Sequence, residues 1–300
     1  MKIAETPFYR RNKSLSQKFG AVFVNLILLT AGVLSLMPLV HILAVSLSAT
    51  GPANANMVNF IPIGFNLNSY AEAVKDPKML TALMNTIYRT AIGVPFNMLM
   101  TIICAYPLSI ANDKFPLRRV YSGFIVFTML FSGGLIPSYI LILNLGLMNN
   151  IWALILPGVP VFHVIIMMNF FRRLPVELRE AAIIDGADHI TTLTKIYLPL
   201  SGAVLATLTL FCFVFHWNAW FDALMYMRNL DNMPLQNYIQ SLIVRMNTSP
   251  DLEEARRLAL IARRSLLFAR IFISLLPIML LFPFIQKYFQ RGIVLGAIKG

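Results

Sequence analysis

The residues that could do chemistry in this sequence gather in two short stretches. The first, EAAIIDGADHITTLTKIYLP at positions 180–199, is polar and charged although apolar segments flank it. The second, FHWNAWFD at positions 215–222, combines a histidine, an amide and two tryptophans, which can bind a polar ligand through hydrogen bonds and aromatic faces. The sequence contains no His-Glu-x-x-His, Gly-x-Ser-x-Gly or Gly-x-x-x-x-Gly-Lys-Ser/Thr motif. We therefore expect no catalytic residue, metal or cofactor in this chain.

The composition predicts an all-α membrane protein. Hydrophobic residues make up 58% of the 300 positions and charged residues only 13%, whereas soluble domains carry about 25% charge. The apolar runs approach the roughly 20 residues that a membrane-spanning helix needs, while β-barrel strands would alternate over about 10. The formal net charge of +12 is spread over loop ends, so it indicates membrane topology and not a nucleic-acid partner.

Six spans satisfy the alternation of charge along the chain. Basic residues before the first span place the N-terminus in the cytoplasm, and the count of six returns the C-terminus to the same side. The expected spans are residues 22–47, 91–111, 120–143, 151–171, 202–224 and 266–289. They form a single transmembrane domain, residues 19–300, after a cytoplasmic segment 1–18. Gly133, Gly134 and Pro137 predict a bend in the third span.

Two loops between these spans are predicted to contain helices. In the cytoplasmic loop 172–199, Pro175 favours a helix start, Gly186 a left-handed end, and Asp188 the cap of a second helix that Pro199 stops. In the extracytoplasmic loop 225–265, one helix is expected from Leu235 and another after Ser249. From these features alone, the cytoplasmic helix pair is equally well an ordinary amphipathic connector.

The spacing within the cytoplasmic loop resembles that of a known family. Glu180-Ala181-Ala182, three residues, Gly186, nine residues and Ile196-x-Leu198-Pro199 match the EAA loop of ABC importer permeases. The ending GIVLGAIKG resembles that of maltose-type sugar permeases. FSGGLIPSYILI, PLQNYIQSLI and LLPIMLLFPFIQKYF resemble a polysaccharide or complex-sugar branch that includes alginate-type importers. The resemblance covers nearly the whole chain from about Ser35 onward.

This resemblance implies a type I ABC importer permease in a bacterial inner membrane. Its implied partners are a second homologous permease, two ATP-binding subunits that hold ATP and Mg, an extracytoplasmic solute-binding protein, and a sugar. The EAA loop would be the coupling helix that rests on the ATPase. The implied coupling residues are Glu180, Ala181, Ala182, Asp185, Gly186, Ile196, Leu198 and Pro199. The tail, with Ala297, Ile298, Lys299 and Gly300, is implied to reach the ATPase dimer.

Candidates for the substrate path come from residue type. Sugars bind to aromatic faces and hydrogen-bonding groups, which gives the set His216, Trp217, Asn218, Trp220, Tyr139 and Asn169. The alternative for the first four is an interfacial aromatic belt with one satisfied histidine, and for the others it is packing. His163 is a further candidate of the same kind as Asn169, with packing as the preferred alternative, and we expect His41 to form hydrogen bonds within the bundle.

Arg270 lies inside the sixth span, where a charge normally faces a partner or a watery cavity. Asp222 is the expected partner, and snorkelling to the interface is the alternative. Together with Arg263 and Arg264, Arg270 would form an electropositive approach for an acidic sugar such as a uronate oligomer. Two other function classes stay open: a secondary transporter or channel, which needs its own intramembrane ion site, and a membrane-embedded enzyme.

Overall fold

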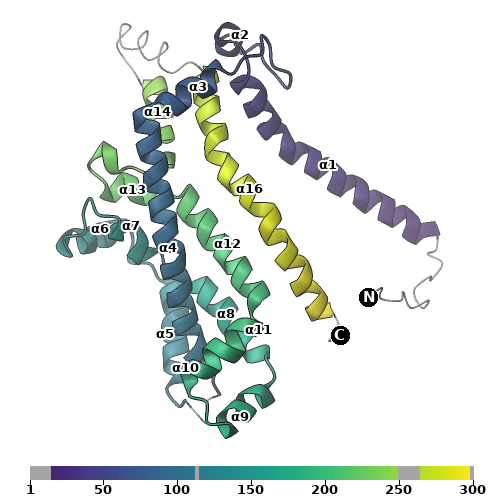
Figure 1. Ribbon diagram of the computed structural model, residues 1–300, viewed down its shortest axis with the longest axis vertical. Helices are drawn as coiled ribbons and strands as arrows, with labels where there is room; N and C mark the ends of the chain where they lie inside the picture. Colours follow the sequence, from purple (N-terminus) through teal and green to yellow (C-terminus); the bar gives the residue numbers. More distant parts are fainter. Residues whose placement is uncertain (1–14, 112–114, 249–263, 298–300) are drawn as a thin grey trace. The chain divides into compact units, whose positions relative to one another are not determined.

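The computed structural model describes residues 15–111, 115–248 and 264–297, and this part of the chain contains helices and no strand (Figure 1). The α-helices are α1 (Leu15–Ser46), α2 (Thr50–Asn54), α3 (Asn68–Lys75), α4 (Pro77–Ser109), α5 (Arg118–Leu130), α6 (Leu135–Asn144), α7 (Trp152–Ile155), α8 (Val161–Arg173), α9 (Val176–Ile184), α10 (His189–Thr192), α11 (Leu198–Leu200), α12 (Gly202–Asn218), α13 (Phe221–Tyr226), α14 (Leu235–Thr248) and α16 (Arg264–Ala297). Short 3-10 turns cover Leu156–Gly158 and Leu230–Asn232.

Three described helices are long and apolar enough to cross a membrane, and three bent pairs bring the number to six if each pair is one span. The long helices contain the segments Phe19–Ser46, Pro77–Ser109 and Arg264–Leu281. The pair α5 and α6 bends by 111°, at the glycine pair where the sequence predicted a bend. The all-α prediction is confirmed for the described residues.

Contacts divide the chain into two compact units, one containing α1, α2 and the start of α16, the other containing α4 to α14 and the rest of α16. In the first unit, Ala44, Val45, Ala53 and Val58 form a small buried cluster with Phe268. The second unit holds the larger core, in which α4 packs against α8 and α12.

Helix α4 organises the second unit, and it is longer than the sequence predicted. Asp76 caps it by accepting a hydrogen bond from the Lys78 amide, and Pro77 occupies the first turn, where its missing N–H costs nothing. The helix therefore begins at Pro77, whereas the expected span began at residue 91. The additional turns bring polar side chains into the bundle. The expected span 202–224 also differs from the structure. It is interrupted, because α12 ends at Asn218 and α13 is a separate short helix.

Candidate functional site

A stripe of polar and small residues runs along the buried face of α4. Thr86, Arg89, Gly93, Asn97 and Thr101 are spaced three or four residues apart, so they lie on one side of the helix. All five are buried. Because α4 packs against α8 and α12 on its buried side, this stripe provides hydrogen-bonding groups inside an otherwise apolar bundle.

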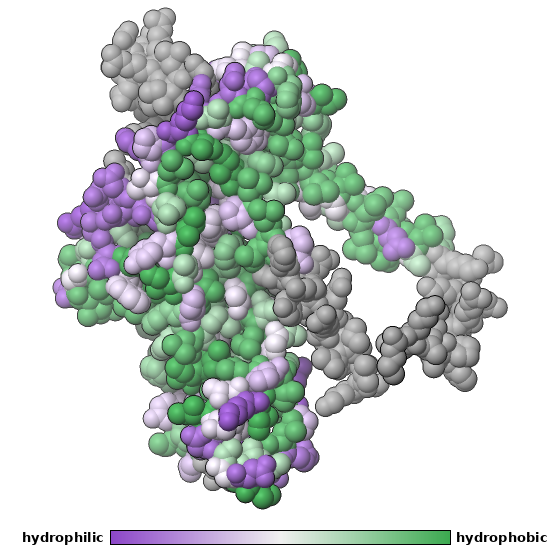
Figure 2. All heavy atoms as spheres, viewed as in Figure 1, coloured by the Kyte–Doolittle hydropathy of each residue, from purple (hydrophilic) through white to green (hydrophobic). Residues whose placement is uncertain are grey.

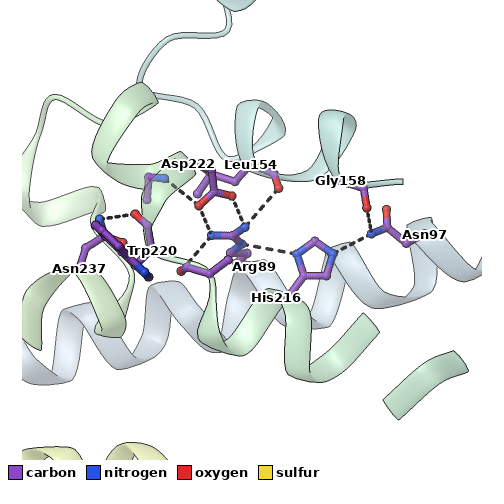
Figure 3. Close-up of polar contacts among 10 residues, drawn as sticks. Arg89, Asn97, Leu154, Gly158, His216, Trp220, Asp222 and Asn237 are labelled. Carbon is purple, nitrogen blue, oxygen red and sulfur yellow. Dashed lines mark hydrogen bonds and ion pairs between the residues drawn. The ribbon is translucent and has the colours of Figure 1, made fainter. Parts of the chain in front are cut away.

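Arg89 is the centre of this stripe, with a side chain that is 0% exposed (Figure 3). Its guanidinium forms a salt bridge with Asp222, in which Nη1 lies 3.1 Å from Oδ1 and Nη2 contacts Oδ2. Nη2 also donates to the Leu154 carbonyl at 3.4 Å, and Nη1 to the Ala219 carbonyl at 3.5 Å. One side chain therefore links α4 to α7, to the end of α12 and to α13.

His216 extends the cluster toward the middle of α4. Arg89 Nε lies 3.4 Å from His216 Nδ1, and Asn97 Nδ2 lies 2.9 Å from His216 Nε2. Asn97 also donates to the Gly158 carbonyl at 2.9 Å, which ties α4 to the turn before α8. A Cβ atom at Gly93 would come within 2.6 Å of the imidazole ring, so only glycine leaves room for it. The ring is thus enclosed between helices.

The cluster corrects one sequence expectation: Asp222 pairs with Arg89 and not with Arg270. Arg270 is buried on α16, with 4% exposure. In its own unit, the Arg264 guanidinium lies 5.3 Å from the ring centroid of Phe268, while Arg263 lies outside the described residues. Arg89 was missed because it preceded the expected second span. The spacing of Thr86, Arg89, Gly93 and Asn97 was the signal that could have found it.

The other candidates for the substrate path do not gather at one place. Trp217 is buried, stacks on Phe213 and donates from Nε1 to the Ser274 carbonyl at 2.9 Å, as a packed core residue does. Asn218 and Trp220 are exposed around the end of α12, and Asn169 is exposed on α8.

Tyr139 and the remaining histidines have partners within the chain. The Tyr139 hydroxyl accepts a hydrogen bond from Arg228 at 3.2 Å, and its ring stacks on that of Tyr226. His163 is buried with its Nδ1 3.4 Å from the Cys212 sulfur, which confirms packing. His41 Nδ1 lies 2.7 Å from the Asn59 carbonyl oxygen, which confirms a hydrogen-bonding role.

The cytoplasmic loop predicted from the sequence contains the expected helix pair. α9 ends before Gly186, whose φ of +79° is the left-handed conformation that the sequence predicted. Asp188 caps α10 by accepting a hydrogen bond from the Thr191 amide at 2.7 Å. Hydrogen bonds from Thr191 hold the pKa of this carboxyl below its usual value, since they stabilise its charged form.

The second helix of this pair continues further than predicted. After α10 the chain forms a π-helical turn over Leu193–Tyr197 and then α11, so Pro199 begins a helical turn where the sequence predicted a stop. Proline is tolerated there because the first turn leaves its amide position unpaired. The direction changes only at Ser201, and the helical segment His189–Leu200 makes an angle of 85° with α12.

The helix pair, α9 with α10, has one face against the bundle and one face open. On the bundle side, Arg179 and Ala182 are buried, and the rings of Tyr106, Phe171 and Tyr197 lie edge to face with one another. The ring of His189 also lies edge to face with that of Tyr106. Ile196 and Leu198 are half-buried and pack on the same core. This face fixes the pair to α4 and α8.

The open face carries apolar side chains beside charged ones. Ile184 is 85% exposed, and Ile183, Ile190, Val176 and Leu178 are also exposed. Glu180, Ala181, Asp185 and Gly186 are exposed next to them. Figure 2 shows hydrophobic and hydrophilic residues intermixed at the end of the molecule that α9 occupies in Figure 1. Of the residues implied to contact an ATPase, Ile298, Lys299 and Gly300 lie outside the described residues.

Comparison with known proteins identifies the family. Residues 71–295 match the profile of the binding-protein-dependent transport system inner membrane component. LplC of Bacillus subtilis is 34% identical over 94% of this chain and 97% of its own length. The polygalacturonan/rhamnogalacturonan transport system permease YtcP of the same organism is 34% identical over 91% of this chain and 96% of its own length. A chain in the crystal structure of a bacterial ABC transporter involved in the import of the acidic polysaccharide alginate is 30% identical, with a TM-score of 0.82 over 95% of this chain and 100% of that one. These matches confirm the resemblance to ABC importer permeases, a family of transport subunits. The chain therefore belongs to the family of binding-protein-dependent transport system inner membrane components.

Proposed function

We propose that this chain is the permease subunit of an ATP-driven importer for acidic oligosaccharides. The observation that carries the proposal is the similarity, over almost the whole chain, to a permease of an alginate importer and to a polygalacturonan/rhamnogalacturonan permease. Alginate and polygalacturonan are both polymers of uronic acids, although their sugars differ. Their shared feature, a carboxylate on each ring, defines the substrate class that we propose.

The helix pair supports the coupling role in this proposal. Its bundle face is held by a buried aromatic cluster, so a push on the pair is transmitted to α4 and α8. Its open face presents Ile184 and other apolar side chains to solvent, which is unfavourable unless another protein covers them. We propose that an ATPase subunit binds this face, with Glu180, Ala181 and Asp185 at the contact and Gly186 holding the turn. Ile196, Leu198 and Pro199 would fix the pair to α12.

The proposed assembly contains a second permease, two ATP-binding subunits that carry ATP and Mg, and an extracytoplasmic solute-binding protein. The family description, binding-protein-dependent transport, supports the solute-binding protein. We place it in the bacterial inner membrane with both termini in the cytoplasm and the helix pair on that side. Lys299 and Gly300 remain proposed contacts of the tail with the ATPase. Exposed Asn218 and Trp220 remain proposed substrate contacts, whereas the packed surroundings of Trp217 and His216 favour structural roles.

Reconstituted uptake tests the proposal. This chain would be coexpressed with its partner permease and ATPase, once copurification has identified them. The complex would be placed in liposomes with the binding protein and supplied with trigalacturonate or its neutral methyl ester. We expect uptake of the acid that requires ATP and stops when the ATPase is inactivated. Uptake that persists without the ATPase would indicate a secondary transporter, and a preference for the ester would overturn the acidic substrate class.

A further inference from the structure

A polar cavity of about 260 Å³ lies beside the outer turns of α4, away from the helix pair. Its polar wall is formed by carboxamide side chains, a tyrosine and an arginine: Asn85, Tyr88, Arg89, Asn149, Asn150 and Asn232. The rest of the lining is apolar and consists of Ile151, Leu154, Met227 and Pro234. The volume is below the roughly 300–1,000 Å³ of sites for drug-sized ligands, so it suits one small polar ring and not a whole oligomer. Figure 2 shows hydrophilic residues gathered at this level of the molecule, over the segment that follows α13.

Hydrogen bonds hold the walls of this cavity in place. Asn85 on α4 donates from Nδ2 to the Asp231 carbonyl at 2.7 Å and to the Met233 carbonyl at 3.2 Å. The Asn149 amide donates to the Tyr226 carbonyl at 2.8 Å, and its Oδ1 accepts from the Asn229 amide at 3.2 Å. Asn149 also has a φ of +59°, an uncommon backbone conformation that these contacts maintain. The cavity is therefore formed before any ligand arrives.

These same bonds leave other polar groups of the wall available. Asn149 and Asn150 use their Oδ1 atoms on backbone amides, and within the described residues their Nδ2 groups make no hydrogen bond. Among the same residues, Asn85 bonds only through Nδ2, which leaves its Oδ1 as an acceptor, and the Asn232 side chain makes no hydrogen bond. The ring of Tyr88 is 57% exposed. Two donors, an acceptor and an aromatic face at one small cavity match the hydroxyl groups and the apolar face of a sugar ring.

The cavity does not select for charge. Arg89 is its one charged lining residue, and the salt bridge to Asp222 neutralises the guanidinium. A carboxylate that entered the cavity would therefore gain little from Arg89 unless it displaced Asp222. Recognition here rests on ring hydroxyls, which neutral and acidic sugars share.

The cavity lies at the N-terminal end of α4, whereas the helix pair contacts its C-terminal end. Asn85 contacts the segment 231–233, whereas Tyr106 contacts His189 of α10. Asn85 and Tyr106 are 21 positions apart, which corresponds to about 30 Å of helix. If the helix pair meets the ATPase in the cytoplasm, the cavity lies on the side from which substrate arrives.

We propose that this cavity is a sugar subsite that binds one ring of the incoming saccharide through its hydroxyl groups. The inference rests on the proposed function and names a binding site within it. It assigns saccharide contacts to Asn85, Tyr88, Asn149, Asn150 and Asn232, none of which the sequence motifs indicated. Selection for the charge of the substrate is left to the solute-binding protein.

Direct binding to the assembled importer tests this subsite. The complex would be placed in lipid nanodiscs without the binding protein, and tritium-labelled trigalacturonate and its methyl ester would be measured by equilibrium dialysis. We expect the two dissociation constants to agree within about threefold. Tyr88→Ala and Asn232→Leu should each weaken both about 3- to 10-fold, the range for losing one neutral hydrogen bond or ring contact. Met84→Ala, at an exposed position one turn earlier on α4, is the matched control and should bind as the unaltered importer does.

The outcomes separate the subsite from the proposed function. Equal binding by Tyr88→Ala, Asn232→Leu and Met84→Ala overturns the subsite, as does the absence of saccharide binding in a complex that shows ATP-driven uptake. The cavity would then be a contact for a protein segment. A tenfold or greater preference for the acid contradicts recognition through hydroxyls. Loss of ATP-driven uptake of every saccharide by the unaltered importer would instead overturn the proposed function.

Discussion

The Arg89 cluster, formed by Arg89, Asn97, His216 and Asp222, buries and pairs its polar groups, whereas the helix pair exposes apolar side chains to solvent. In the cluster, a fully buried guanidinium finds a carboxylate, an imidazole and two carbonyls within the same chain. In the helix pair, Ile184 and its apolar neighbours project into solvent, although the opposite face of the same helix is buried. A group satisfied inside the chain contributes to folding, whereas a face left open is suited to a partner. Substitutions in the two regions should therefore affect different measurements.

Breaking the salt bridge should have the largest effect on stability. Asp222→Asn leaves the Arg89 charge buried without its counterion, a loss that costs about 3–5 kcal/mol at buried pairs. We expect a marked fall in the thermal unfolding temperature of the permease in detergent, measured by fluorescence-detected gel filtration. Arg89→Met should be similarly damaging, because it leaves the Asp222 carboxylate without its partner.

The double variant Arg89→Met with Asp222→Leu sharpens this test. It removes both charges, so we expect it to recover most of the stability that either single variant loses. If the single variants unfold at the same temperature as the unaltered chain, the cluster does not hold α4 to α13 as described.

Crowding the cluster through Gly93 should have the next largest effect. Gly93→Ala places a methyl group 2.6 Å from the His216 ring, and the ring is held on both sides by Arg89 and Asn97. We expect a destabilisation of about 1–3 kcal/mol, typical of overpacking. Gly123→Ala on α5 is the control, since no atom lies within 4 Å of its added Cβ, and it should leave the unfolding temperature unchanged or slightly raised.

The two regions also differ in how well sequence predicted them. The helix pair was predicted almost residue by residue, because Pro175, Gly186 and Asp188 act through the local backbone. The π-helical turn after α10 was not predicted, because the interactions that favour it come from the packing of Tyr197 and its neighbours on the bundle. The bend between α5 and α6 was likewise predicted by glycine and proline.

The Arg89 cluster was missed because its chemistry depends on residues far apart in the chain. Arg89 and Asp222 are separated by 133 positions, and no local rule brings them together. Hydropathy placed the start of the second span too late, because Asn85, Thr86 and Arg89 lower the apolar average of the first turns of α4. Asp222 was then assigned to Arg270, a cation that did fall inside an expected span.

Straining the turn of the helix pair should affect coupling more than stability. Gly186→Val forces a β-branched residue into a φ of +79°, which costs roughly 1–2 kcal/mol locally. A Cβ atom at this position meets no atom within 4 Å, so we expect the effect to come mainly from the backbone. We expect the assembled importer to hydrolyse ATP without matching uptake. Gly186→Asn is the control because asparagine tolerates the left-handed conformation, and it should retain most uptake; normal coupling in the valine variant would remove the role of this turn.

Changing the open face itself should leave the permease as stable as before. Ile184 is 85% exposed, so Ile184→Glu removes no internal contact, and exposed substitutions of this kind stay within about 0.5 kcal/mol. The same change places a charge in the apolar part of the proposed ATPase contact, where burial without a partner is costly. We expect an unchanged unfolding temperature together with loss of the ATPase during copurification, and Ile184→Leu should retain the ATPase. If Ile184→Glu lowers stability yet still copurifies with the ATPase, the open face belongs to the fold, and its contrast with the Arg89 cluster disappears.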